Sequence, residues 1–274
     1  MQLIEKTIKT KLTDNAKFYG YVLDNSPEMD INRRRPAILI IPGGGYAMTS
    51  DREAEPVAIK MLSKGYQAFI LRYNVAPVRY PAALLEIASS VKLIRDNAEA
   101  WHVDPDKIIL AGFSAGGHLA ANLATAWNGQ LLQGYGYKRE DIQPNGLMLG
   151  YSVITSGKYA HVDSFKNLLG DDYNNEVIRE SVSLEKQVTA ATPRTFLWHT
   201  YTDDCVPVEN SLLFADALKK ANVPLEMHIF PQGGHGLSLG TAETAIAENG
   251  YGIQTDLSVW PDLFATWVNN SFNK

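Results

Sequence analysis

The chain is poor in cysteine, and this absence narrows what the protein can be. Cys205 is the one cysteine among 274 residues, so no disulfide can form within the chain. This usage is typical of a reducing compartment, and we expect a cytoplasmic protein. Because small free cysteines usually pack like apolar side chains, the sequence favours a packed Cys205 over a nucleophilic one.

Long apolar runs and blocks of one charge sign are also missing. No apolar run approaches the roughly 20 residues of a membrane-spanning helix, and the first residues, MQLIEKTIKTKLTDN, lack the apolar centre of a signal peptide. The net charge is −5 with both signs interspersed, which does not favour a polyanion as a ligand. We therefore expect neither a membrane nor a nucleic acid as partner, and the sequence leaves a homo-oligomer open.

The composition that is present predicts a globular α/β domain. Hydrophobic residues make up 45% of the chain and charged residues 20%, which is enough for a sizeable core. Apolar runs typical of buried strands occur at residues 36–41, 67–73, 107–111, 146–151, 195–199 and 225–230. Helical patterns follow at residues 52–64, 81–101, 211–221 and 260–268, and residues 103–106 read as a turn.

This alternation predicts a mostly parallel sheet with helices on both faces. The first thirty residues alternate polar and apolar positions, as in an antiparallel edge hairpin. We expect one domain over residues 1–274, with residues 152–192 as a small cap-like insert. In such sheets, binding sites collect where the strands end.

The stretch IILAGFSAGGH places Ser114 between glycines where a strand turns into a helix. A serine hydroxyl attacks a carbonyl only when it stands clear of its backbone and a base takes its proton. Small residues at positions 112 and 116 relieve the crowding of the tight turn that exposes it. The pattern therefore favours Ser114 as a nucleophile; the alternative is a glycine-rich turn whose serine caps the helix.

A second glycine cluster, PGGGY at residues 42–46, follows the first buried strand. Three glycines let the backbone approach a ligand with its N–H groups forward. A plain flexible turn and a phosphate cradle are the alternatives, but no Gly-Lys-Ser/Thr follows, which excludes a Walker loop.

The sequence offers one favoured base and two acids. His235 lies on the loop PQGGHG directly after the last predicted strand, where flanking glycines let an imidazole reach a neighbouring serine. The other histidines read as packed, hydrogen-bonded or surface residues, although His161, in the insert, could touch a substrate. Asp203 and Asp204 follow the preceding strand, and spacing alone does not separate them.

Together these segments resemble the α/β-hydrolase superfamily, and more closely the bacterial short-chain carboxylesterases related to acetyl xylan esterases. The matching residues are 42–46, 50–54, 71–73, 104–107, 112–118, 151–156, 199–200, 203, 206–207 and 234–236. Two positions depart from the pattern. Pro42 stands where hormone-sensitive-lipase-like enzymes carry a histidine, and Thr200 replaces a glycine that many relatives have.

The resemblance implies an α/β-hydrolase fold and acyl transfer to water through an acyl-serine, without a metal or cofactor. It implies Ser114, Asp203 and His235 as the catalytic residues. The oxyanion hole would then consist of the N–H groups of Gly44, Gly45 and Ala115. The implied substrates are small esters, above all acetyl esters of sugars or small alcohols.

The sequence gives few clues to the substrate pocket. Tyr46, Arg52 and Tyr73 are candidates for a polar wall that would suit a sugar. The insert has no long apolar lid, which disfavours a true lipase. An amidase, formamidase or small peptidase with the same triad is the alternative enzyme. A hydrolase-like binding protein without activity is a third reading, which the presence of all three triad residues disfavours.

Overall fold

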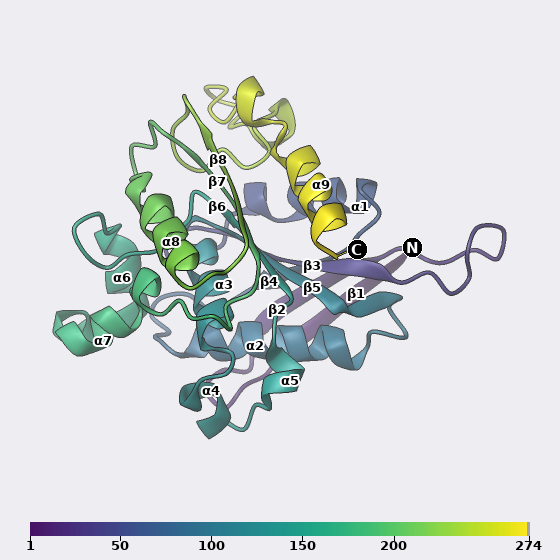
Figure 1. Ribbon diagram of the computed structural model, residues 1–274, viewed down its shortest axis with the longest axis horizontal. Helices are drawn as coiled ribbons and strands as arrows, with labels where there is room; N and C mark the ends of the chain where they lie inside the picture. The colour runs from purple at the N-terminus through teal and green to yellow at the C-terminus, as the bar shows by residue number, and fades with distance from the viewer. Residues whose placement is uncertain (273–274) are drawn as a thin grey trace.

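The strands form one sheet, and the triad candidates lie beyond the carboxyl-terminal ends of its strands. The computed structural model describes residues 1–272. Within them the sheet has eight strands in the order β1-β2-β4-β3-β5-β6-β7-β8 (Figure 1). The strands are β1 (Gln2–Ile8), β2 (Ala16–Val22), β3 (Arg35–Ile41), β4 (Gln67–Arg72), β5 (Val103–Phe113), β6 (Gly146–Gly150), β7 (Thr195–Thr200) and β8 (Leu225–Phe230).

The sheet is parallel except at its amino-terminal edge. β1 pairs antiparallel with β2 and β2 antiparallel with β4, whereas β4, β3, β5, β6, β7 and β8 run parallel. The predicted edge hairpin is therefore confirmed. β2 alternates buried and more exposed positions, whereas β6 and β7 are buried throughout. This difference explains why the central strands are continuous apolar runs in the sequence.

Helices cover both faces of the sheet, as predicted (Figure 1). α1 and α9 pack against one face, and α2, α3 and α8 pack against the other. The helices are α1 (Glu55–Ser63), α2 (Ala82–Asp96), α3 (Ser114–Ala126), α4 (Gln130–Gly134), α5 (Arg139–Ile142), α6 (Val162–Leu169), α7 (Glu176–Ser181), α8 (Glu209–Lys220) and α9 (Trp260–Phe272). Short 3₁₀ turns are η1 (Asp51–Glu53), η2 (Gly170–Asn174), η3 (Leu184–Lys186), η4 (Ala242–Thr244) and η5 (Thr255–Leu257).

Two predicted boundaries are wrong around residue 100. The helix predicted over residues 81–101 ends at Asp96, and the predicted turn at residues 103–106 is part of β5. His102 has a positive φ of 53°, which a right-handed helix does not accept. The chain therefore turns there, and Val103 pairs with Arg35 of β3 before a shift in register between Arg35 and Ala37.

The predicted insert at residues 152–192 contains α6, η2, α7 and η3. It leaves the sheet after β6 and returns at β7. No helix within residues 1–272 has both the length and the apolar character needed to cross a bilayer.

Candidate active site

Ser114 lies at a tight turn between β5 and α3, and the surrounding glycines make that turn possible. Its φ of +50° is in the left-handed region, which is strained for a residue with a side chain. A Cβ on Gly112 would lie 2.6 Å from the carbonyl oxygen of Gly116. A Cβ on Gly116 would overlap the carbonyl oxygens of Ile41 and Pro42. Gly112 therefore lets α3 pack closely on the end of β5, and Gly116 lets α3 approach the chain where β3 ends.

The structure brings the three predicted triad residues together. Ser114 Oγ lies 2.8 Å from His235 Nε2, and His235 Nδ1 lies 2.9 Å from Asp203 Oδ2. The serine follows β5, the aspartate follows β7 and the histidine follows β8. Because these strands are parallel, their carboxyl-terminal ends bring the three residues to the same end of the sheet. Hydroxyl, imidazole and carboxylate thus form a continuous hydrogen-bonded chain.

The geometry separates the two candidate acids. Asp203 has a fully buried side chain, and its Oδ1 accepts hydrogen bonds from the backbone N–H groups of Cys205 (3.0 Å) and Val206 (2.9 Å). These bonds hold the carboxylate in place and leave its second oxygen for the histidine. Asp204 is exposed and is not the residue that faces His235. Asp203 therefore occupies the acid position.

Hydrogen bonding decides the ionisation of this buried acid. Burial by itself would raise the pKa of Asp203, but hydrogen bonds from His199 and His235, and the positive charge of His235 when protonated, lower the pKa well below its usual range. The carboxylate is therefore ionised throughout the neutral range. An ionised partner at Nδ1 orients the imidazole and leaves Nε2 free to accept the serine proton.

The glycine loop presents N–H groups beside the serine. Gly44 and Gly45 have φ values of +128° and +63°, and a Cβ on Gly44 would overlap the carbonyl of Met48. The N–H of Gly43 is already bonded to Glu53 Oε2 at 2.6 Å, so it is not a free donor. Ala115 is the second residue of α3, where N–H groups lack an acceptor within the helix. Gly44, Gly45 and Ala115 thus remain the candidate oxyanion donors.

Tyr46 and Tyr73 do not form the substrate wall that we expected. Both side chains are buried, with exposed fractions of 2% and 3%. The Tyr46 hydroxyl donates to His118 Nδ1 at 2.8 Å, and the Tyr73 hydroxyl donates to the carbonyl of Pro42 at 2.9 Å. Each phenol is held inside the protein and supports the glycine loop from behind. The sequence alone did not distinguish these roles, because tyrosines occur both in protein cores and in the walls of binding pockets.

Arg52, the third residue predicted to bind substrate, is only partly buried. Its Nε donates to the carbonyl of Thr244 at 2.5 Å, and a Cβ on Gly236, next to His235, would lie 4.0 Å from its Nη1. Within residues 1–272 its buried Nη2 has no hydrogen-bond partner. Arg52 therefore lies beside the histidine loop and stays a candidate for substrate contact.

The insert reaches the glycine loop through α6. Asn167 Nδ2 donates to the carbonyl of Gly45 at 2.9 Å, and a Cβ on Gly45 would lie 3.9 Å from Ser164 Oγ. The same hydroxyl lies 2.8 Å from His161 Nδ1. Burial lowers the pKa of His161, and the nearby charge of His235 lowers it further. The insert thus brings a second, half-buried imidazole close to the triad.

Within residues 1–272, neither the free cysteine nor a metal-binding cluster supplies a competing centre. Cys205 is exposed rather than packed in the core. Its thiol is still partly shielded from water, and this shielding, followed by the charge of Asp203, raises the pKa of Cys205. A raised pKa disfavours a thiolate nucleophile. Among residues 1–272, no group of three His, Cys, Asp or Glu side chains is arranged to hold a metal ion.

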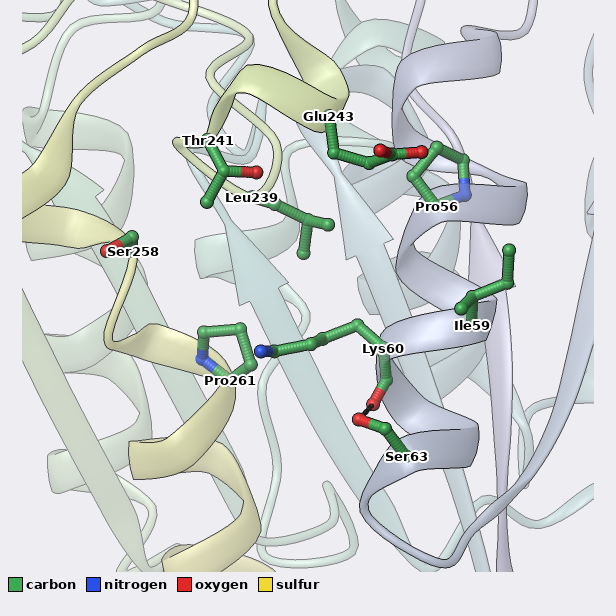
Figure 2. A pocket seen from close by; sticks show the side chains of 9 residues that line it. All are labelled: Pro56, Ile59, Lys60, Ser63, Leu239, Thr241, Glu243, Ser258 and Pro261. Atoms are coloured by element: carbon green, nitrogen blue, oxygen red, sulfur yellow. Dashed lines mark hydrogen bonds between the residues drawn. The ribbon is translucent and has the colours of Figure 1, made fainter.

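A cavity of about 400 Å³ lies between α1 and the segment that leads into α9 (Figure 2). Lys60 extends across it from α1 toward Pro261, and Leu239 and Thr241 line the opposite side. None of the triad residues lines this cavity. It is therefore separate from the chemistry at Ser114.

Three residues around the site carried no usable signal in the sequence. His199 read as a structural histidine, yet it shares the carboxylate of Asp203. Glu53 and Tyr151 lie in segments that match the family that the sequence resembles. Nothing in their local pattern indicates that the Tyr151 hydroxyl donates to Glu53 Oε1 at 2.6 Å. Their contact joins parts of the chain 98 residues apart, which only the folded structure reveals.

Comparison with known proteins agrees with this geometry. The chain is 38% identical over 214 residues to endo-1,4-beta-xylanase B of Butyrivibrio fibrisolvens, which covers 77% of this chain and 34% of that protein. The chain thus spans about a third of the length of this curated relative.

Two solved structures match along nearly the whole chain. The acetyl ester-xyloside bifunctional hydrolase of Caldicellulosiruptor lactoaceticus has a TM-score of 0.79 and 37% identity, over 93% of this chain and 88% of that one. Carboxylesterase Cest-2923 of Lactobacillus plantarum WCFS1 has a TM-score of 0.89 and 30% identity, over 98% of both chains. Residues 25–218, more than half of the chain, match BD-FAE. The chain belongs to the BD-FAE family of α/β hydrolases.

Proposed function

We propose that the protein is a serine hydrolase that cleaves short-chain acyl esters, of the acetyl type, on carbohydrates or small alcohols. The observation that carries this proposal is the hydrogen-bonded chain from Ser114 through His235 to Asp203, with bond lengths of 2.8 and 2.9 Å. A serine activated in this way attacks acyl carbonyls. The two similar structures are named as an acetyl ester-xyloside bifunctional hydrolase and a carboxylesterase. These names support an ester as the bond that is cleaved and a carbohydrate as part of the substrate.

The first half-reaction acylates the serine. Ser114 Oγ bonds to the ester carbonyl carbon while its proton passes to His235 Nε2, and Asp203 stabilises the imidazolium that forms. The carbonyl oxygen becomes an oxyanion that accepts hydrogen bonds from Gly44, Gly45 and Ala115. Each such donor contributes about 3 kcal/mol to lowering the barrier. When the tetrahedral intermediate collapses, the ester C–O bond breaks and His235 returns the proton to the leaving alcohol.

The second half-reaction releases the acid. Water enters where the alcohol left, His235 Nε2 takes one of its protons, and the resulting hydroxide adds to the acyl carbon. Collapse of this second intermediate breaks the bond to Ser114 Oγ, which regains the proton from His235. The carboxylic acid leaves and the enzyme is restored. The preference for short acyl groups is supported by the insert, which places His161 and α6 rather than a long apolar lid next to the glycine loop.

A substrate panel tests this function. It contains p-nitrophenyl acetate, butyrate and octanoate, an acetylated xylo-oligosaccharide and an acetyl anilide. We expect acetate to be hydrolysed faster than octanoate and the esters faster than the anilide. A preference for octanoate would remove the short-acyl assignment, and a preference for the anilide would favour an amidase. Ser114→Ala should lower kcat by about 10³-fold or more with an unchanged fold by circular dichroism; appreciable residual activity would mean another nucleophile.

A further inference from the structure

A buried carboxylate that the mechanism above does not use lies behind the glycine loop. Glu53, at the end of η1, has an exposed fraction of 4%. Its Oε2 accepts the N–H of Gly43 at 2.6 Å, and its Oε1 accepts the hydroxyl of Tyr151 at 2.6 Å. One side chain thus connects the glycine loop with the residue that follows β6.

The partners of this carboxylate are neutral groups, a backbone N–H and a phenol hydroxyl. Within residues 1–272, Glu53 forms no ion pair with a lysine, arginine or histidine. Burying a carboxylate is costly unless hydrogen bonds replace its hydration. The two short bonds are therefore what keeps Glu53 in this position, and without the carboxylate the Gly43 N–H and the Tyr151 hydroxyl would both lose their acceptor. A position that retains such a group calls for an explanation beyond packing.

On one side, Glu53 sets the geometry of the glycine loop. A Cβ on Gly43 would lie 2.8 Å from Ser114 Cβ and 2.8 Å from the carbonyl oxygen of Phe113, so the backbone of Gly43 packs directly against the nucleophile. The bond from the Gly43 N–H to Glu53 fixes the orientation of this peptide. Two of the three candidate oxyanion donors, Gly44 and Gly45, follow immediately and take their position from it.

On the other side, Glu53 acts through Tyr151 on the histidine loop. The Tyr151 hydroxyl accepts the N–H of Ser238 at 3.0 Å, and its ring packs edge-on against His235, with centroids 5.1 Å apart and planes at 74°. Burial first, and then the charge of Glu53, raise the pKa of Tyr151 well above its usual value. The phenol therefore stays protonated and keeps donating to Glu53.

We propose that Glu53 is a positioning residue that sets the oxyanion donors and the His235 imidazole relative to one another. This proposal rests on the proposed esterase function. The geometry at stake is used only when the oxyanion forms, because the ground-state ester makes weaker hydrogen bonds to the same donors. A disturbed link between the two loops should consequently lower kcat and leave KM nearly unchanged.

The experiment compares Glu53→Gln with Glu86→Gln on p-nitrophenyl acetate. Glu86 is a matched control, because it is a fully buried carboxylate that accepts bonds from Thr13 Oγ1 (2.6 Å) and from Asn74 N (2.8 Å) and Nδ2 (2.6 Å). We expect Glu53→Gln to lower kcat by about 100-fold with KM within about threefold, as a displacement of roughly 1 Å does elsewhere. Both variants should lower the melting temperature to a similar extent, because each changes a buried, hydrogen-bonded carboxylate. Glu86→Gln, however, should keep kcat within about threefold of wild type.

Tyr151→Phe provides an independent variant that keeps the ring against His235 and removes the hydroxyl that donates to Glu53 and accepts the N–H of Ser238. It should also lower kcat selectively, and the double variant with Glu53→Gln should be no worse than the poorer single variant. Should Glu53→Gln fail to fold, Tyr151→Phe decides alone. A kcat loss no larger than in Glu86→Gln, or a loss confined to KM, would overturn the positioning role. An inactive wild type would instead overturn the proposed function.

Discussion

His199 Nε2 lies 3.1 Å from Asp203 Oδ2, the same oxygen that faces His235. The same nitrogen lies 3.0 Å from the carbonyl oxygen of Val206, which can only accept, so the proton of the neutral imidazole is on Nε2. Nδ1 then accepts the hydroxyl of Ser211 at 2.7 Å. A second, fully buried histidine thus holds the same oxygen of the candidate acid that faces His235.

Replacing His199 by leucine tests the importance of this support. The change leaves the Ser211 hydroxyl and the Val206 carbonyl without their partner and removes one donor from Asp203. We expect a loss of about 2 kcal/mol or more in the free energy of unfolding, because each unsatisfied buried group costs about 1–3 kcal/mol. We also expect a kcat about tenfold lower, because the carboxylate is less firmly oriented. Urea unfolding and hydrolysis of p-nitrophenyl acetate measure the two effects.

His228→Leu is the matched control for this prediction. His228 also lies on a strand of the sheet and contacts a carboxylate, with Nε2 3.0 Å from Glu226 Oε1, but it has no bond to a triad residue among those described. Its replacement should leave kcat unchanged. A His199→Leu variant whose kcat equals that of His228→Leu would mean that Asp203 needs no support from His199.

The fold was predictable from the sequence because its central strands are buried on both faces. Residues 38–41 of β3 and 108–111 of β5 are inaccessible to solvent, and such strands leave continuous apolar runs in the sequence. The elbow was equally visible, because Gly112 and Gly116 are required by backbone contacts rather than by side-chain chemistry. Boundaries near residue 100 were missed because α2 ends at Asp96 with no glycine or proline beside it, and the left-handed residue in the following turn is a histidine, His102.

Side-chain direction was the part that the sequence did not reveal. Tyr46 lies in the glycine loop and Tyr73 lies directly after β4, yet the hydroxyls of both point into the protein. Asp203 and Asp204 are adjacent, and only the backbone turn that lets Asp203 accept the N–H groups after it decides which one faces the histidine. Glu53, two residues before α1, resembles any acidic residue that precedes a helix. Such choices depend on contacts between distant segments, which local patterns do not record.

Asparagine substitutions at the two adjacent aspartates test the assignment of the acid. Asp203→Asn removes the charge that stabilises the imidazolium and favours the wrong tautomer of His235, so kcat for p-nitrophenyl acetate should fall by about 10³- to 10⁴-fold. Asp204→Asn changes an exposed side chain and should leave kcat within about threefold, as surface substitutions usually do. Equal losses in the two variants would contradict the assignment.

His118 makes the stability of the protein depend on pH. The ring is fully buried; its Nε2–H donates to the carbonyl of Val182 at 2.8 Å, and its Nδ1 accepts the hydroxyl of Tyr46 at 2.8 Å. Burial lowers the pKa of His118 from 6.5 to about 4, although the bond to Val182 opposes this. Between these two pH values the unfolded chain binds a proton that the folded protein does not. The free energy of unfolding therefore falls as the pH falls through this range.

The shift corresponds to about 3 kcal/mol, which is fully present above pH ~6.5 and lost by pH ~4. His118→Gln removes the titrating ring while its amide can still donate to the carbonyl of Val182. We expect the variant to be less stable than wild type at pH 7, and the difference to shrink by about 3 kcal/mol between pH 7 and pH 4. Urea unfolding at a series of pH values measures both curves, and the other titrating groups largely cancel in the difference. A difference that stays constant with pH would mean that His118 titrates alike in the folded and unfolded states. The assignment of His118 as a buried neutral imidazole would then be wrong.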